Sequence, residues 1–345
     1  MHAIWRVKQV HISHLGDTHE ESLVALAALA CAATASAQSS VTIYGRLDVG
    51  VTRQNDGTTS LNGSNGQTGA AGKRWDVRQG SGNRLGFRGT EDLGGGLSAG
   101  FHFEHRFTAD NGAADATFWA ARSYLQLQSK TLGRVYLGRE YIPAFFPALR
   151  LDPWGFDTVG TPGPKHQLAN YTIDGGIRSN NTVGYQTPSF AGLTVQAAIA
   201  AGEGTRPRGT GVNVEYLRGG LYLAAAMDRQ SDAQKVALVG GSYDFGFVKP
   251  MLTYQRSKVA GVDHRNLSAA LTAPIGAGVL KAGWFRLDPT GADNNTTKVG
   301  LGYEYFLSKR TSIYADVGSA DQEGRTGLIE RTRTTAVDLG LKHNF

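Results

Sequence analysis

Arginine recurs at positions that would share one face of four early extended segments. Arg46 lies in the first segment, Arg84 and Arg88 in the second, Arg106 in the third and Arg122 in the fourth. Apolar residues occupy alternate positions, so in a strand the guanidinium groups point to one side and the apolar groups to the other. A row of fixed cations beside water raises the local concentration of anions. These five arginines are the candidate functional residues.

Two patterns in the third segment resemble catalytic or metal-binding motifs. Gly96–Gly100 has the form G-x-S-x-G, but a nucleophile elbow needs a helix after the serine, and the sequence after Ser98 alternates like a strand. A tight turn explains these glycines better than catalysis does. Glu104 and His105 are adjacent, so in a strand they point to opposite faces and cannot hold one metal ion. We expect no catalytic residue, metal or cofactor.

The composition restricts the class of protein. The 345 residues include 46 Gly, 10 Pro and one Cys, and 19% are charged, which excludes a disordered chain and a disulfide-rich one. Mean hydropathy is −0.26, and no internal run approaches the roughly 18 apolar residues of a membrane-spanning helix. Glycine is about twice as common as usual, which favours strands and turns over long helices.

An apolar block near the start predicts export. Leu23–Ala37 ends in an A-x-A pattern, so we read residues 1–37 as a signal peptide. Its leader is acidic where a basic one is expected, which points to a true start further along the chain. The alternative to a signal peptide is that this apolar block forms an ordinary buried helix. Residues 38–345 then form one domain. The formal net charge is +6, but export argues against nucleic acid as the partner.

From residue 38 onward, segments of about ten residues alternate apolar and polar side chains, with connectors rich in Gly, Asn, Asp, Ser or Pro. The connectors alternate between short and mostly longer, as in a membrane barrel with tight turns at one rim. Sixteen segments are predicted. They begin near Val41, Arg84, Leu97, Phe118, Arg134, Thr182, Leu193, Gly211, Leu221, Gln234, Val248, Asn266, Val279, Thr296, Thr311 and Thr332.

Because hydrocarbon offers the backbone no hydrogen-bond partner, strands that cross it must close into a barrel. We therefore predict an all-β fold, a 16-stranded antiparallel transmembrane barrel with apolar residues toward lipid and arginines toward a wet lumen. Arg139 departs from this pattern, because it shares a face with Val135 and Leu137. A bulge or the start of a loop there would explain it. A soluble secreted β-sandwich or adhesin, with the apolar face inward, is the alternative.

Several stretches resemble the general porins of β-proteobacteria. They are QSSVTIYGRLDVG, GNRLGFRGTEDLGGGLSAGFHFE, ARSYLQLQSKTLGRVYLGREY, NTVGYQTPSFAGLTVQAA and the terminal LKHNF. The resemblance implies an outer-membrane barrel in contact with lipid and lipopolysaccharide, a homotrimer with early and final strands at the contacts, and Phe345 as part of the signal read by the barrel assembly machinery.

The resemblance also implies a site. The long connector Ile142–Asn180 would be the third external loop, folded inward to narrow the pore. Asp152 and Asp157 would face the arginine wall, with Glu140 near the base of the loop. The expected function is passive diffusion of small hydrophilic solutes and ions, anionic or neutral, with anion preference because arginine outnumbers acid. An outer-membrane protease or phospholipase is the alternative, but its histidines would have to cluster, and here they are scattered.

Overall fold

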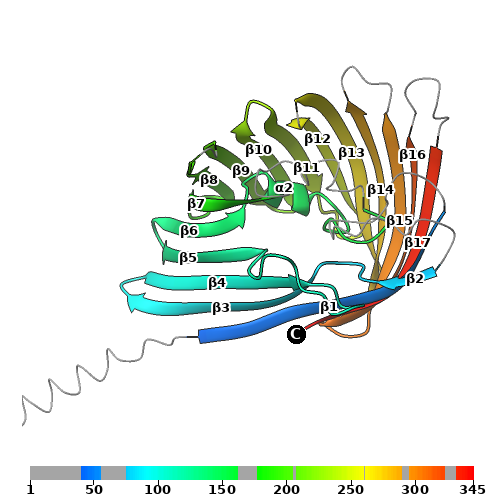
Figure 1. The fold of residues 1–345 in the computed structure, drawn as a ribbon, viewed down its shortest axis with the longest axis horizontal. Coiled ribbons are helices and arrows are strands. Elements are labelled where there is room, and N and C mark those ends of the chain that lie inside the picture. The colour runs from blue at the N-terminus through cyan, green and yellow to red at the C-terminus, as the bar shows by residue number, and fades with distance from the viewer. Residues whose placement is uncertain are drawn as a thin grey trace, which may run out of the picture.

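The computed structural model describes residues 40–55, 75–161, 177–204, 207–259, 261–289, 295–322 and 332–345. The predicted signal peptide, residues 1–37, lies outside the described residues. Within them the chain is mostly β-strand, with one short helix, α2, at Phe145–Arg150 (Figure 1). In the described part of the chain no helix is long and apolar enough to cross a membrane.

The strands follow one another along the chain. The first nine are β1 (Ser40–Gln54), β2 (Trp75–Arg78), β3 (Asn83–Gly94), β4 (Leu97–Phe107), β5 (Arg122–Ser129), β6 (Gly133–Tyr141), β7 (Arg178–Gln186), β8 (Leu193–Ala200) and β9 (Gly209–Arg218). The remaining eight are β10 (Leu221–Ser231), β11 (Gln234–Tyr243), β12 (Lys249–Val259), β13 (Val262–Ile275), β14 (Gly278–Pro289), β15 (Thr296–Phe306), β16 (Thr311–Gln322) and β17 (Thr332–Asn344).

These strands close into an antiparallel barrel. The short β2 and the longer β3 both pair with β1 and together take the place of one barrel strand, so the seventeen segments form a 16-stranded barrel. From β3 onward each strand pairs with the next, and β17 returns to pair with β1. The last residue completes the closure, because Phe345 and Gly45 exchange backbone hydrogen bonds of 3.0 and 3.1 Å. The predicted fold is confirmed.

Polarity is inverted relative to a soluble domain. Apolar side chains such as Val41 and Leu125 point outward and are 66% and 63% exposed. Polar side chains such as Asp48, Gln196 and Gln255 point inward and are buried. Only alternate residues of each strand need to be apolar, which reconciles the polar mean hydropathy with a membrane barrel. The β-sandwich alternative, which needs the opposite polarity, is wrong.

Two local departures from regular pairing have clear causes. The segment expected to start near Phe118 becomes a strand only at Arg122, because the Phe118 carbonyl contacts the ring of His105 and Phe118 stacks on that ring. At Arg139 a bulge shifts the β6–β7 register. The bulge directs the Arg139 guanidinium to the carbonyl of Ala120 at 2.8 Å. The predicted bulge is therefore present.

Figure 1 shows α2 inside the barrel, and the chain ends at the rim that holds the turn between β15 and β16, where the backbone N–H of Asn344 donates to the carbonyl oxygen of Arg310 at 2.8 Å. That rim carries the tight turns, in which glycines such as Gly94–Gly96 and Gly219–Gly220 have positive φ angles. Short turns are periplasmic in outer-membrane barrels and long connectors are external. We call the two rims periplasmic and external accordingly.

The outward face gives a first prediction. Val239 on β11 is 53% exposed on the apolar outer face. Val239→Arg should destabilise the barrel by about 2–4 kcal/mol, because it places a charge on the lipid-facing surface. The free energy of unfolding, measured by denaturant titration in vesicles, would test this, with Val239→Leu as the uncharged control. An unchanged value for Val239→Arg would contradict the inverted polarity.

Candidate constriction site

The connector after β6 enters the lumen and is fastened to the wall on one side at β9 and β10. The backbone N–H of Ala144 donates to Asp228 Oδ2 at 2.6 Å. The side chain of Asn213 donates to the carbonyl oxygen of Pro143 at 2.7 Å. The buried carboxyl group of Asp228 and the amide of Asn213 therefore anchor the start of the loop to the wall.

The same loop is fastened to β16 and β17 on the other side of the lumen. Trp154 Nε1 donates to Asp316 Oδ1 at 2.7 Å. The backbone N–H of Val159 donates to Asp338 Oδ2 at 3.1 Å. The loop therefore bridges two parts of the wall that lie far apart in the sequence.

Apolar packing supplements these polar contacts. Phe145 and Phe156 of the loop form a buried cluster with Ala226, Val236 and Leu238, which point inward from β10 and β11. Inward apolar residues are unusual in a wet lumen, and here the loop covers them. Burial of apolar area at roughly 25 cal/mol per Å² stabilises the inward position of the loop.

Glycines on the wall make room for the loop. A Cβ added at Gly300 of β15 would lie 1.9 Å from the carbonyl oxygen of Gly160, and one added at Gly283 of β14 would lie 3.1 Å from the ring of Trp154. The loop therefore approaches the wall at a distance that larger residues do not allow.

Opposite the loop, a wall of basic residues lines a cavity of about 750 Å³. Arg46, Arg84, Arg106 and Arg122 all line it. The loop contributes Phe145, Phe146, Leu149 and the segment from Trp154 to Asp157 to the same cavity. Strand parity and barrel closure thus bring four of the five candidate arginines together, facing the loop.

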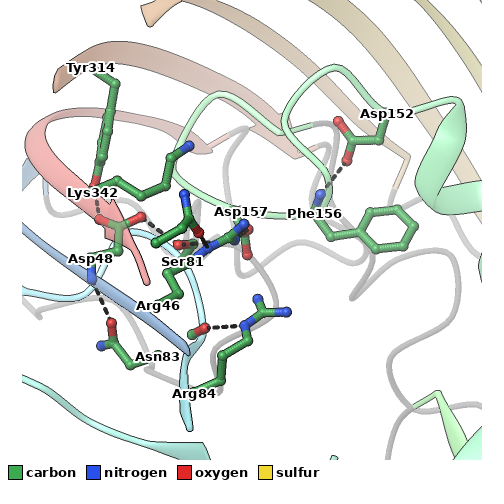
Figure 2. Close-up of polar contacts among 12 residues, drawn as sticks. Arg46, Asp48, Ser81, Asn83, Arg84, Asp152, Phe156, Asp157, Tyr314 and Lys342 are labelled. Carbon is green, nitrogen blue, oxygen red and sulfur yellow. Dashed lines mark hydrogen bonds and ion pairs between the residues drawn. The ribbon is translucent and has the colours of Figure 1, made fainter. Parts of the chain in front are cut away.

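The arginines differ in their partners. Arg46 Nη1 lies 3.2 Å from Asp157 Oδ2 across the cavity (Figure 2). Arg106 pairs with Glu104 of its own strand at 2.7 Å. Arg84 Nε donates to the carbonyl oxygen of Gly82 at 3.1 Å and makes no ion pair with any described residue.

Tyr141 connects the basic wall to the loop. Its hydroxyl accepts hydrogen bonds from Arg106 at 3.1 Å and from Arg178 at 2.7 Å. The Arg122 guanidinium lies 4.9 Å from the centre of its ring. The ring also stacks on Phe145 of α2 at 3.9 Å. Cation–π contacts and stacking therefore hold the wall and the helix in a fixed relation.

Comparisons with known proteins give the family. The family described as Gram-negative porin matches residues 22–325. The chain belongs to this family.

Individual proteins that resemble this chain are also porins. The chain is 32% identical to outer membrane porin protein 32 of Delftia acidovorans and 29% identical to an outer membrane porin protein of Bordetella pertussis, over 94% of this chain and the whole of each relative. Among solved structures, an anion-selective porin from Comamonas acidovorans is 28% identical with a TM-score of 0.77, over 89% of this chain and all of that one. OmpT of Vibrio cholerae, at 16% identity and a TM-score of 0.64, shares the fold over 90% of this chain and all of that one.

The porin is thus an outer-membrane β-barrel that crosses the membrane many times. Its family consists of channels rather than enzymes. Among the described residues, no group of three or more His, Cys, Asp or Glu side chains could hold a metal ion.

The structure places three of the expected site residues outside the cavity. Arg88 lies over the ring of Tyr44 at 5.4 Å, nearer the periplasmic turn. Glu140 is buried behind the wall, 3.0 Å from Arg122 Nε. Asp152 does not face the arginines as expected, because its carboxylate is buried within the loop.

The Asp152 carboxylate organises its own loop. It accepts hydrogen bonds from the backbone N–H groups of Trp154 at 2.9 Å and Phe156 at 3.0 Å, and from the Thr161 hydroxyl at 2.6 Å. Figure 2 shows it turned toward Phe156. Burial raises the pKa of the Asp152 carboxyl above its usual value. The resemblance did not predict that Asp157 faces Arg46 while Asp152 turns into its own loop, because contacts of the loop with the wall and with itself set these directions.

Two basic residues of the cavity escaped the sequence analysis. Arg178 starts β7 in a region assigned to the long connector, and Lys342 lies near the end of β17. The signal for Lys342 was present, because it alternates with the outward Leu341 and His343. Arg178 had no such signal, since the segment was expected to begin only near Thr182.

The close approach of the loop backbone at Gly160 to Gly300 of β15 gives a second prediction. Gly300→Val should force the loop away from the wall, because even a Cβ there would overlap the carbonyl of Gly160. We expect the single-channel conductance to change by about two-fold or more and to become noisier, as measured in planar bilayers. Val299→Ala, on the outward face of the same strand, is the control. A conductance for Gly300→Val equal to that of the control would show that the contact does not hold the loop.

Proposed function

We propose that this porin is a passive diffusion channel for small hydrophilic solutes that prefers anions, with its narrowest section between the basic wall and the inward loop. The observation that carries the proposal is the charge of the cavity. Its described lining has six basic residues, Arg46, Arg84, Arg106, Arg122, Arg178 and Lys342, and three acidic ones, Glu104, Asp115 and Asp157.

Geometry explains why this balance favours anions. The basic residues lie on the wall, whereas Asp157 lies on the loop across the gap. Opposite charges across water produce a transverse field that orients dipolar solutes, while the net positive charge concentrates anions. A Debye length of about 8 Å at physiological salt confines this effect to the narrow section.

Each residue then has a role. Arg84 and Arg178, which make no ion pair with a described residue, would attract the passing anion most directly. Arg46, Arg106 and Arg122 would contribute while remaining paired with Asp157, Glu104 and Glu140. Arg88 would act only in the periplasmic half of the lumen, and Asp152 would set the shape of the loop. The similarity to a porin of Comamonas acidovorans that is described as anion-selective supports the same sign.

We infer that the porin is a homotrimer that uses its early and final strands for contacts. An aromatic patch supports this, formed by Phe87 and Phe103 packed against Trp119 and by Phe118, which is 62% exposed. A contiguous exposed aromatic patch of this kind suits a protein partner. An enzymatic role is not favoured, because the described histidines at residues 102, 105, 264 and 343 lie on three separate strands.

Substitution of Arg84 by cysteine, followed by modification of the new thiol, gives a third prediction. The chain without residues 1–37 has no cysteine, so Arg84→Cys introduces a single thiol. The ratio of anion to cation permeability should fall by about two- to four-fold, as expected for one partly screened charge at a few ångströms. A positively charged methanethiosulfonate reagent should restore the ratio and a negatively charged one should lower it further. Reversal potentials under a KCl gradient measure this.

The matched control is Arg88→Cys, an arginine on the lumen side that does not line the cavity. Its permeability ratio should change less. Equal changes at both positions would show that the narrow section is not where we place it, and a cation-selective wild-type channel would reject the proposed charge assignment.

The chain terminus gives a fourth prediction. We propose that Phe345 is part of the signal recognised by the assembly machinery. Deletion of Phe345 should lower the amount of folded porin in the outer membrane several-fold, measured by heat-modifiable migration, whereas Phe345→Tyr should keep most of it. Refolding of both variants in detergent separates recognition from stability. A deletion variant that also fails to refold would assign Phe345 to closure of the barrel instead.

A further inference from the structure

The short helix of the inward loop leaves two apolar side chains at the edge of the cavity. Phe145, Pro147 and Ala148 of α2 are buried. Phe146 and Leu149 are only half-buried, and both line the cavity opposite the basic wall. Residues three apart lie on the same side of a helix, so these two side chains form one apolar surface. We call Phe146 and Leu149 the apolar face of the loop.

The loop is attached to the wall mainly through other residues. Ala144, Trp154 and Val159 make its hydrogen bonds to the strands, and Phe145 lies in the buried cluster with β10 and β11. Phe146 adds an edge contact to the ring of Phe145 at 5.6 Å. Apolar surface that borders water is stabilised when the apolar part of a solute covers it. The apolar face of the loop is therefore available for such a contact.

Cations lie close to this face. The ring of Tyr141 is 6.1 Å from the ring of Phe146, measured between their centres. The guanidinium groups of Arg122 and Arg178 lie 4.9 and 4.4 Å from the centre of the same Tyr141 ring. Arg46 and Arg122 line the cavity with 25% and 23% of their side chains exposed. Guanidinium groups bind carboxylates and also lie flat on aromatic rings, so they suit both parts of an aromatic acid.

The cavity therefore offers cations and apolar surface to the same solute. Its volume of about 750 Å³ is within the range of sites that bind small molecules. A small inorganic anion would contact the cations alone, and a neutral apolar solute would contact the apolar face alone. A carboxylate that carries a ring would contact both.

We propose that the narrow section binds carboxylates that carry an apolar ring more strongly than hydrophilic anions of the same size and charge. The carboxylate would lie among Arg46, Arg122 and Arg178, and the ring would lie on Phe146 and Leu149. Contact on one side of the ring favours entry without preventing release, as conduction requires. This inference rests on the proposed function, because it names the class of solute that the same narrow section prefers.

The experiment uses the porin without residues 1–37 in planar bilayers at a constant KCl concentration. Sodium benzoate is added, and the concentration that blocks half of the blockable chloride current is measured. Sodium gluconate is the comparison, because it is a hydrophilic monocarboxylate of similar size. Benzoate should reach half-block at a concentration about five- to ten-fold lower than gluconate, as burial of one side of a ring predicts. Benzamide, which has the ring without the charge, should not block in the same range.

Two variants of the apolar face test where the ring lies. Phe146→Ser and Leu149→Ser should each reduce the benzoate preference over gluconate to about two-fold or less. The matched control is Phe247→Ser in the turn between β11 and β12, because Phe247 is 73% exposed and does not line the cavity. It should keep the full preference. Heat-modifiable migration verifies that each variant is folded, and Leu149→Ser alone decides the test where Phe146→Ser does not fold.

Three outcomes would overturn the inference. Benzoate and gluconate could block the wild-type channel equally, or benzamide could block as well as benzoate. Both variants could also change the half-block of benzoate and gluconate by the same factor or by none, which would limit the apolar face to a role in the position of the loop. The reversal potential of the wild-type channel in KCl alone keeps this test separate from that of the charge preference. An anion-selective channel with no preference for benzoate would contradict the present inference only.

Discussion

The structure depends on the need to satisfy every backbone hydrogen bond where no water is available. A sheet that crosses hydrocarbon cannot have a free edge, so β17 must return to β1, and the chain ends at the residue that completes the pairing, Phe345 against Gly45. Closure fixes the strand order and the register together. Which side chains of the wall lie side by side in the lumen follows from that register.

Closure creates a lumen, and the inward loop divides it. Acidic side chains of the wall hold the loop backbone at two places, Asp228 at Ala144 and Asp338 at Val159, while phenylalanines of the loop cover apolar residues of β10 and β11. The loop keeps its inward position because many separate contacts hold it. Tyr141 then couples this loop to the arginines, so its position and the charge opposite it are set together.

Arginine lies on both the inner and the outer face of the barrel, in different surroundings. Inward arginines such as Arg84 and Arg106 line the cavity of the lumen, whereas outward ones such as Arg229 and Arg265 lie near the ends of their strands on the outer face. Near the middle of the bilayer an outward arginine would be destabilising. At the rim it can interact with the charged headgroups, so depth in the membrane decides what a cation can do.

The sequence by itself determined the barrel, its strand number and the lumen side of Arg46, Arg84, Arg106 and Arg122, because a period of two residues is a local property that barrel closure preserves. The tertiary structure alone decided which charges meet. Lys342 and Arg178 join the cavity through the register of distant strands. Asp157 reaches Arg46 while Asp152 turns into its own loop. A loop has no fixed period, so its side-chain directions follow from long-range contacts that local alternation does not encode.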